Sequence, residues 1–178
     1  MKHFTLFGLA ALLSVATAAQ TPYGRDKVVE VDTVSSAAIL QATARKWFID
    51  TFKDANEVIQ MDDPATNTII GKGWSEYGAV GALHYTIEVA CKKGRARIRI
   101  YDVTHKGVGS LTISGATAPY PSFGLLFDQE HCYSNGDREK RVLKVCANLR
   151  PGADAEIDPI MASLEKALLS PKAATSDW

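Results

Sequence analysis

The chain has 178 residues, and its 20 basic and 20 acidic side chains give a formal net charge of zero at pH 7. This length is sufficient for one domain with a substantial core. Because proteins that bind nucleic acid neutralise phosphates with an excess of positive charge, the balanced composition argues against nucleic acid as a partner.

The N-terminus has the order of features found in secretory signal peptides. Lys2 and His3 precede an uncharged apolar run, residues 4–16, which is short for a membrane-spanning helix. Small residues follow, and their spacing predicts cleavage after Ala18 or Ala19. The alternative, a buried N-terminal helix, does not account for this order of charge, apolar run and small residues.

These features divide the chain into three predicted segments: a signal peptide at 1–19, a single α+β domain at 20–169 and a mobile tail at 170–178. No later segment is long and apolar enough to predict a transmembrane helix. We therefore expect the mature protein to be soluble and exported, either periplasmic or secreted.

The domain is predicted to begin with a strand and a helix. Valines between positions 28 and 34 predict the strand, and Ser35 or Ser36 is suited to cap a helix that runs to about Phe52. Apolar residues recur on one side of this helix at helical spacing: Leu40, Ala44, Trp47, Phe48 and Phe52. The aromatic members suggest either a ligand pocket or core packing, and core packing is favoured because large aromatics dominate cores.

Two further strands are predicted, with a turn between them. Residues 58–61 form a short candidate strand, residues 62–67 have the composition of a turn, and residues 69–77 form the next strand. Gly71 and Gly73 share one face of that strand, so a helix can approach closely there. A phosphate-binding function for this Gly-Lys-Gly is disfavoured, because phosphate-binding loops have more glycines and lead into a helix.

Residues 82–103 predict a long β-hairpin with a two-residue turn at 93–94. In this register Val89 faces Ile98 and Ile87 faces Ile100, which makes one side apolar. The other side places Arg95 opposite Lys92, Arg97 opposite Ala90 and Arg99 opposite Glu88. Because a slip of one residue would scatter this segregation, the pattern supports the register. The arginines are then the solvated half of an alternating strand rather than a surface for nucleic acid or anionic lipid.

The remaining sequence is less regular. Residues 104–135 have weak periodicity, and residues 142–149 are compatible with a strand or a helix. Asp158 and Pro159 have the pattern of an N-cap followed by the first helical residue, which predicts a final helix that ends at Pro171. The predicted fold is therefore α+β, with the order β-α-β-β-β-β-α, a curved antiparallel sheet of about five strands, and helices packed on one face.

The elements between residues 28 and 103 resemble an uncharacterised family of exported bacterial domains with a TATA-binding-protein-like fold. The features that carry the resemblance are Trp47-Phe48 at the helix end, Asp62-Asp63 at the turn, Gly71-Lys72-Gly73, and the long hairpin. The resemblance covers about half of the chain and implies a curved antiparallel sheet with helices on one face. It brings no known activity and no catalytic residues, and DNA binding does not follow from the fold name.

Motifs for catalysis or metal binding are not evident. The sequence has no HExxH, GxSxG or CxxC. The strongest local cluster is residues 127–132, yet adjacent ligands on one short segment rarely converge on one ion, so we predict no metal and no cofactor. A turn is also preferred over a calcium loop at 62–67, which lacks the glycine and terminal glutamate of an EF-hand.

The chain has an odd number of cysteines: Cys91, Cys132 and Cys146. In an oxidising compartment Cys132 and Cys146 are close enough in sequence to form a disulfide, although sequence alone does not fix the pairing. Cys91 alternates with apolar residues and is interpreted as a small buried hydrophobe. His84 lies at odd spacing on the same strand and therefore on the opposite face, which argues against a Cys–His catalytic pair.

We predict a non-enzymatic, exported binding domain that acts at the cell envelope through the face of the sheet that the helices leave open. The predicted binding residues are His84, Arg95, Arg97, Arg99 and Tyr101, which suit an envelope protein, a peptide or a small anionic ligand. One alternative is a carrier of an amphiphilic molecule, in a cavity lined by Trp47, Phe52, Ile87 and Ile98. Another is an enzyme whose site is assembled from residues distant in sequence.

Overall fold

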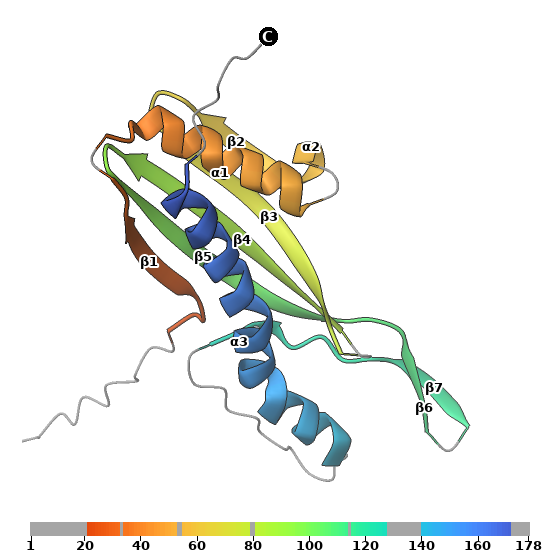
Figure 1. Cartoon of the computed structure of the whole chain (residues 1–178). Helices are drawn as coiled ribbons and strands as arrows, with labels where there is room; N and C mark the ends of the chain where they lie inside the picture. Colours follow the sequence, from red (N-terminus) through yellow and green to blue (C-terminus); the bar gives the residue numbers. More distant parts are fainter. Residues whose placement is uncertain are drawn as a thin grey trace, which may run out of the picture.

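An antiparallel sheet with helices on one face is the central feature of the computed structural model (Figure 1). The structure describes residues 21–32, 34–52, 55–78, 81–113, 115–127 and 140–171; among these, the side chains at 55–56, 111, 113 and 140–146 are not described. The α+β class, the antiparallel sheet and its helices confirm the predicted fold.

The elements follow one another in the order strand, two helices, seven strands, helix within the described residues. They are β1 (Arg25–Glu30), α1 (Ala37–Thr51), α2 (Ala55–Val58), β2 (Ile59–Asp63), β3 (Thr68–Tyr77), β4 (Gly81–Lys92), β5 (Arg95–Gly107), β6 (Ser110–Ile113), β7 (Ala116–Pro119), β8 (Gly124–Leu125) and α3 (Lys140–Leu169). The main sheet has the strand order β1-β5-β4-β3-β2, with β8 paired to β5, and β6 and β7 form a separate hairpin.

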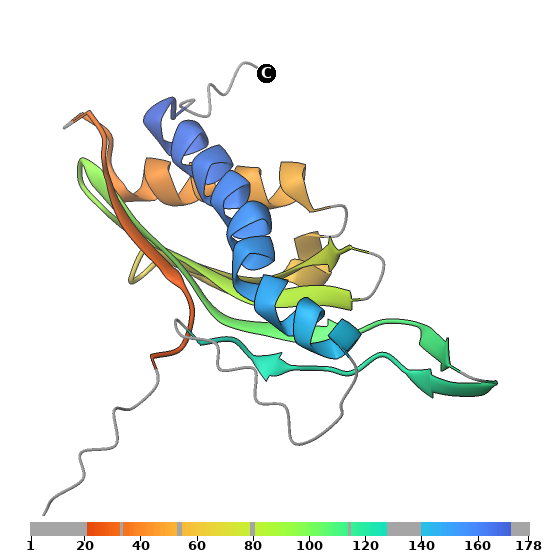
Figure 2. The same ribbon diagram turned by 90° about the horizontal axis from the view of Figure 1, so that it is seen from below.

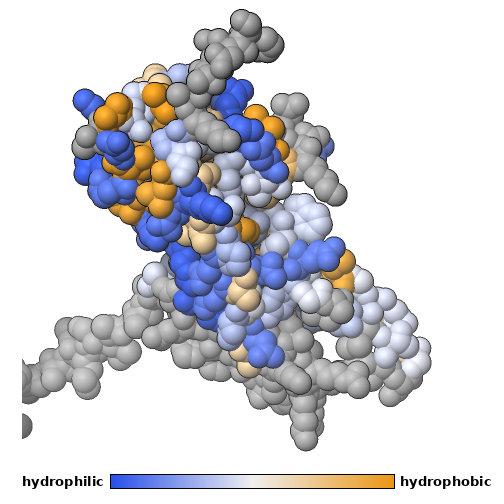
Figure 3. Space-filling model, in the orientation of Figure 1, coloured by the Kyte–Doolittle hydropathy of each residue, from blue (hydrophilic) through white to orange (hydrophobic). Residues whose placement is uncertain are grey.

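Both long helices cover the same face of the sheet, as the edge view in Figure 2 shows. In the orientation of Figure 1, the surface is mostly hydrophilic, and hydrophobic residues gather at the upper left, over the beginning of α1 and the end of α3 (Figure 3). The opposite face of the sheet carries no helix in the described part of the chain.

The predicted hairpin is confirmed in position and register. Gly94 has a φ of 72°, the left-handed conformation that a tight turn requires. Val89 pairs with Ile98 and Lys92 with Arg95, as the segregation of apolar and polar residues predicts. Ile87, Ile98 and Ile100, on the apolar side of the hairpin, are fully buried.

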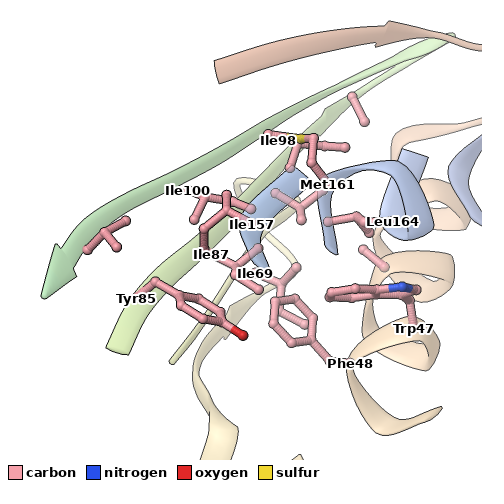
Figure 4. Close-up of a cluster of buried hydrophobic side chains, with 14 of the residues drawn as sticks. Trp47, Phe48, Ile69, Tyr85, Ile87, Ile98, Ile100, Ile157, Met161 and Leu164 are labelled. Carbon is pink, nitrogen blue, oxygen red and sulfur yellow. The ribbon is translucent and has the colours of Figure 1, made fainter. Parts of the chain in front are cut away.

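The core lies between the helices and the sheet. Trp47 and Phe48 from α1 and Ile157, Met161 and Leu164 from α3 reach the layer above the sheet (Figure 4). The predicted close approach at Gly71 is confirmed, because a Cβ there would lie 2.5 Å from Cε1 of Phe48. Gly73 instead makes room for the ring of Tyr85 on the neighbouring strand.

The prediction that the last helix starts at Pro159 is wrong. α3 is a single helix of 30 residues that contains Pro151 and Pro159, and residues 142–149 are part of it. The Asp158 carboxylate accepts a 2.8 Å hydrogen bond from Nε of Arg25 on β1 instead of capping a helix. One apolar stripe continues through both prolines and is buried against the core: Leu149, Ala153, Ile157, Met161, Leu164 and Leu168.

The first strand lies earlier than predicted. β1 ends at Glu30, and Val34 is 82% exposed because the chain turns at Asp32, whose carbonyl accepts the N–H of Ser35 at 2.9 Å. The N-terminal part of β1 includes Arg25 and Lys27, which form ion pairs with α3. These long-range contacts favour a strand where the local sequence is charged.

Some predictions concern residues outside the described part. The signal peptide at 1–19, most of the tail, and Cys132 lie outside it, and the side chain of Cys146 is not described. The predicted disulfide and the predicted cleavage therefore stay predictions. Among the described helices, none has both the length and the apolar character needed to cross a membrane.

Candidate functional site

The candidate site is the side of the main sheet that α1 and α3 leave uncovered, called the open face below. Alternation of side chains along the strands determines which residues belong to it. The rows that cross the sheet on this face include Met61-Ile70-Glu88-Arg99-Asp26, Asp63-Thr68-Ala90-Arg97-Val28, Lys92-Arg95-Glu30, Lys72-Thr86-Tyr101 and Trp74-His84-Thr104.

The predicted arginines all lie on the open face, but two of them are ion-paired. Arg97 donates a 2.9 Å hydrogen bond from Nε to Asp26 on β1, and its Nη2 contacts the same carboxylate. Arg99 lies 3.4 Å from Glu88, as the predicted register requires, and 3.8 Å from Asp26. The hydrogen bond from Arg97 lowers the pKa of Asp26. The middle of the open face is therefore close to neutral.

Arg95 differs from the other two arginines. It faces Glu30 in the strand register, yet within the described residues it forms no ion pair. Together with Val28, Ala90, Lys92 and Arg97, it lines a depression of about 310 Å³ near the hairpin turn. At this end, Lys92 and Arg95 have no carboxylate bound to them among the described residues, whereas Arg97 is paired with Asp26.

Tyr101 lies beside Arg99 at a break in the sheet. The guanidinium carbon of Arg99 is 5.1 Å from the centre of the Tyr101 ring, which is a cation–π geometry. The strand register shifts between His84 and Thr86, and Asp102 has a φ of 53°, as expected at a β-bulge. Partial burial raises the pKa of Tyr101. The end of the open face that carries His84 lies beyond this bulge.

A second depression, of about 300 Å³, lies on that end of the face. His84 stands in its wall, and burial, followed by the charge of Lys106, lowers the pKa of the imidazole. The histidine is therefore neutral at pH 7 and able both to donate and to accept a hydrogen bond. The lining residues are Lys72, Gly73, His84, Tyr85, Thr86, Asp102, Thr104 and Lys106.

Large apolar side chains are also exposed on the open face. Trp74 is 59% exposed, Val28 51% and Met61 39%. Sequence reasoning missed Trp74, although the signal was present: Gly71 and Gly73 face the helices, so the alternating position 74 has to face away from them. It likewise missed Asp26, because only the pairing of β1 with β5 brings that carboxylate to the arginines.

The five predicted binding residues therefore share one face but do not form one cluster. Arg95 lies at the end near the hairpin turn, Arg97 and Arg99 follow in the middle of the face, Tyr101 lies at the bulge, and His84 lies beyond it. Their placement on the uncovered side agrees with the prediction, whereas their role in binding stays a prediction.

The geometry does not favour a thiol nucleophile. Cys91 is 4% exposed on the core side, and burial raises the pKa of its thiol to about 12. His84 lies on the opposite face of the same strand. In the part of the chain that the structure describes, no group of three or more His, Cys, Asp or Glu residues is arranged to hold a metal ion.

The side chains proposed for a carrier cavity belong to the core. Ile87 and Ile98 are fully buried and Trp47 is 6% exposed, and all are part of one hydrophobic cluster against which Phe52 packs. Trp47 and Phe52 also contact each other edge to face, with ring centres 5.8 Å apart. These residues therefore act in packing.

The fold places the chain among α+β proteins with a TATA-binding-protein-like architecture. Residues 26–106 match the family described as "Domain of unknown function (DUF4468) with TBP-like fold", in agreement with the sequence resemblance. No curated protein matches the chain.

Two solved structures share the fold. A TBP-like protein from Parabacteroides distasonis ATCC 8503 has a TM-score of 0.58 and 13% identity, over 88% of this chain and 99% of the other. A DUF4468 family protein from Bacteroides ovatus ATCC 8483 has a TM-score of 0.55 and 17% identity, over 90% of this chain and 94% of the other. At these identities the likeness concerns the fold alone.

Proposed function

We propose that this chain is an exported, non-enzymatic domain that binds an anionic partner at the cell envelope through the open face. The observation that carries the proposal is the uncovered sheet face itself, on which Trp74, Val28 and Met61 are exposed between charged side chains. A mixture of accessible apolar groups and polar groups is typical of binding surfaces. The signal-peptide-like N-terminus supports the envelope as the place of action.

The distribution of charge supports an anionic partner. Within the described chain, Lys92 and Arg95 at one end of the open face, and Lys72 and Lys106 at the other, form no ion pair with a carboxylate. Arg97 and Arg99, between these ends, are already bound to acidic side chains. A partner with negative groups therefore finds accessible cations at the two ends of a nearly neutral centre.

Site-specific photo-crosslinking in cells that express the chain natively tests this proposal. A photoreactive amino acid at Met61, on the open face, is expected to give an adduct of defined mass. The same group at Ile49, which is 51% exposed on α1, is the matched control and is expected to give none. Arg95→Glu should reduce the Met61 adduct, because it reverses an accessible charge. Equal adducts from both positions, or an adduct that Arg95→Glu leaves unchanged, would contradict the proposal.

A further inference from the structure

The depression beside His84 combines three kinds of recognition group. His84 pairs with Trp74 across β3 and β4, and with Thr104 across β4 and β5, so the three side chains form a row on the open face. Trp74 is 59% exposed, and its indole therefore offers a flat apolar surface next to the depression. Lys72 and Lys106 line the depression and supply ammonium groups.

The backbone contributes little to recognition here. β4 has β3 and β5 on its two sides, and β5 pairs with β8 at Thr104 and His105, so the backbone groups in the middle of the depression are used in the ladders. β3 pairs with β2 only as far as Gly71, so Lys72 and Trp74 lie on an edge segment of β3 in the described chain. An extended peptide that adds a strand would bind along that edge of β3 and not in the depression, which is lined by residues of three neighbouring strands. Recognition has to come from side chains: the hydroxyls of Thr86 and Thr104, the neutral imidazole of His84, the ammonium groups and the indole.

We infer that this depression binds an acidic saccharide, an inference that rests on the open face being the binding face. The C–H face of a sugar ring packs on the indole of Trp74, and the carboxylate of a uronic acid pairs with Lys72 or Lys106. Ring hydroxyls hydrogen-bond to Thr86, Thr104 and His84.

The alternatives fit the lining less well. A purely apolar ligand would leave the hydroxyl and ammonium groups of the lining without partners. A bare inorganic anion would make no use of the exposed indole. Asp102 also lines the depression, and its carboxylate accepts hydrogen bonds from sugar hydroxyls while repelling a densely charged polyanion.

The inference is tested by titrating the ¹⁵N-labelled mature protein with trigalacturonic acid and following its amide and indole resonances. Saturable shifts are expected at the Trp74 indole and at Thr86 and Thr104. Trp74→Ala, and the pair Lys72→Gln with Lys106→Gln, should each weaken binding by about tenfold or more, since hydrogen bonds to charged groups and aromatic contacts are of this size. The pair Lys93→Gln with Lys166→Gln, which removes equal charge at exposed positions outside the depression, should leave the affinity unchanged.

Three results would overturn the inference: no shifts at these residues, equal binding of the neutral trisaccharide maltotriose, or an equal loss in the Lys93→Gln and Lys166→Gln control. All the variants change exposed side chains, and a melting curve of each confirms that it folds. The crosslink from Met61 is measured independently. If it persists while trigalacturonic acid does not bind, only the ligand class is wrong; if it is absent, the proposed function itself fails.

Discussion

The ring of Phe48 on α1 occupies the space that a side chain at Gly71 on β3 would fill, with only 2.5 Å between Phe48 Cε1 and an ideal Cβ. Phe48 is fully buried and stacks with Phe52 at a ring distance of 6.0 Å, so it has little freedom to move away. Gly71 therefore sets the distance between this helix and the sheet. The phenyl ring of Phe48 fills the space that the absence of a side chain at Gly71 leaves.

Gly71→Ala is expected to lower the free energy of unfolding by about 1–3 kcal/mol, the usual cost of overpacking a core. In the Phe48→Leu background the same substitution should cost less, because the smaller side chain leaves room for the new methyl group. Urea denaturation of the single and double variants measures this coupling. Lys72→Ala, at the adjacent exposed position, is the control. Strictly additive effects of Gly71→Ala and Phe48→Leu would show that the two residues do not share this space.

A polar cluster holds α3 against β1. The hydroxyl of the fully buried Tyr23 donates a 2.9 Å hydrogen bond to Asp154, which also accepts from Arg25 and, at 3.2 Å, from Nε of Arg150. Both guanidinium groups lie over the ring of Tyr23, at 5.0 Å and 4.3 Å from its centre. This cluster joins the beginning of the described chain to its last helix.

Tyr23→Phe is expected to lower the free energy of unfolding by about 1–3 kcal/mol, because it removes a hydrogen bond to a charged group. Asp26→Asn on the open face also breaks arginine contacts, but those are exposed and should change stability by less than about 1 kcal/mol. The measurement is the denaturation midpoint of each variant. A larger loss in Asp26→Asn than in Tyr23→Phe would contradict this ranking.

Acid should weaken the same cluster. Burial acts to raise the pKa of Asp154, but the hydrogen bonds from Tyr23, Arg25 and Arg150 outweigh it and lower the pKa below 3.8. The folded protein then binds fewer protons than the unfolded chain, so this stabilisation is present above pH 3.8 and is lost as the pH falls through the lowered pKa. In Asp154→Asn, the unfolding free energy should depend less on pH in this range.

The sequence predicted the parts of the fold that follow from local periodicity. The hairpin register came from alternation around a two-residue turn, and α1 came from apolar spacing together with the cap at Ser36, whose hydroxyl accepts the N–H of Ile39 at 3.2 Å. The bounds of β1 could not be predicted in this way, because they depend on ion pairs with residues more than a hundred positions away. The ion pair between Arg97 and Asp26 could not be predicted either, because it depends on the pairing of β1 with β5.

α3 shows how tertiary packing overrides a local signal. Pro159 cannot donate a backbone hydrogen bond and is exposed on the helix surface, while Ile157 and Met161 on either side of it are buried in the core. Pro159→Ala should raise the free energy of unfolding by about 1–2 kcal/mol, since it restores a hydrogen bond but also loosens the unfolded chain. If the helix began at residue 159, this substitution would have no stabilising effect. Thermal denaturation, with Lys166→Ala as an exposed control on the same helix, distinguishes the two outcomes.

His105 is a buried histidine whose protonation should make the stability of the fold depend on pH. It is 1% exposed on the core side of β5, between the rings of Tyr77 and Phe123. Its Nδ1 accepts the N–H of Phe123 at 3.4 Å, and its Nε2 has no hydrogen-bond partner among the described residues. Gly81 allows this position, because a Cβ there would lie 2.3 Å from Nε2. The imidazole therefore has no nearby acidic group in the described chain to stabilise a positive charge.

Burial lowers the pKa of His105 below its ordinary value of 6.5, so the unfolded chain takes up a proton before the folded protein does. The stability that the neutral imidazole contributes is complete above pH 6.5 and is lost as the pH falls toward the lowered pKa. His105→Phe should remove this pH dependence, whereas His84→Gln, at the more accessible histidine, should leave most of it. Urea denaturation between pH 7.5 and 5 checks this prediction. A pH dependence that persists in His105→Phe and disappears in His84→Gln would assign it to the open face instead of the core.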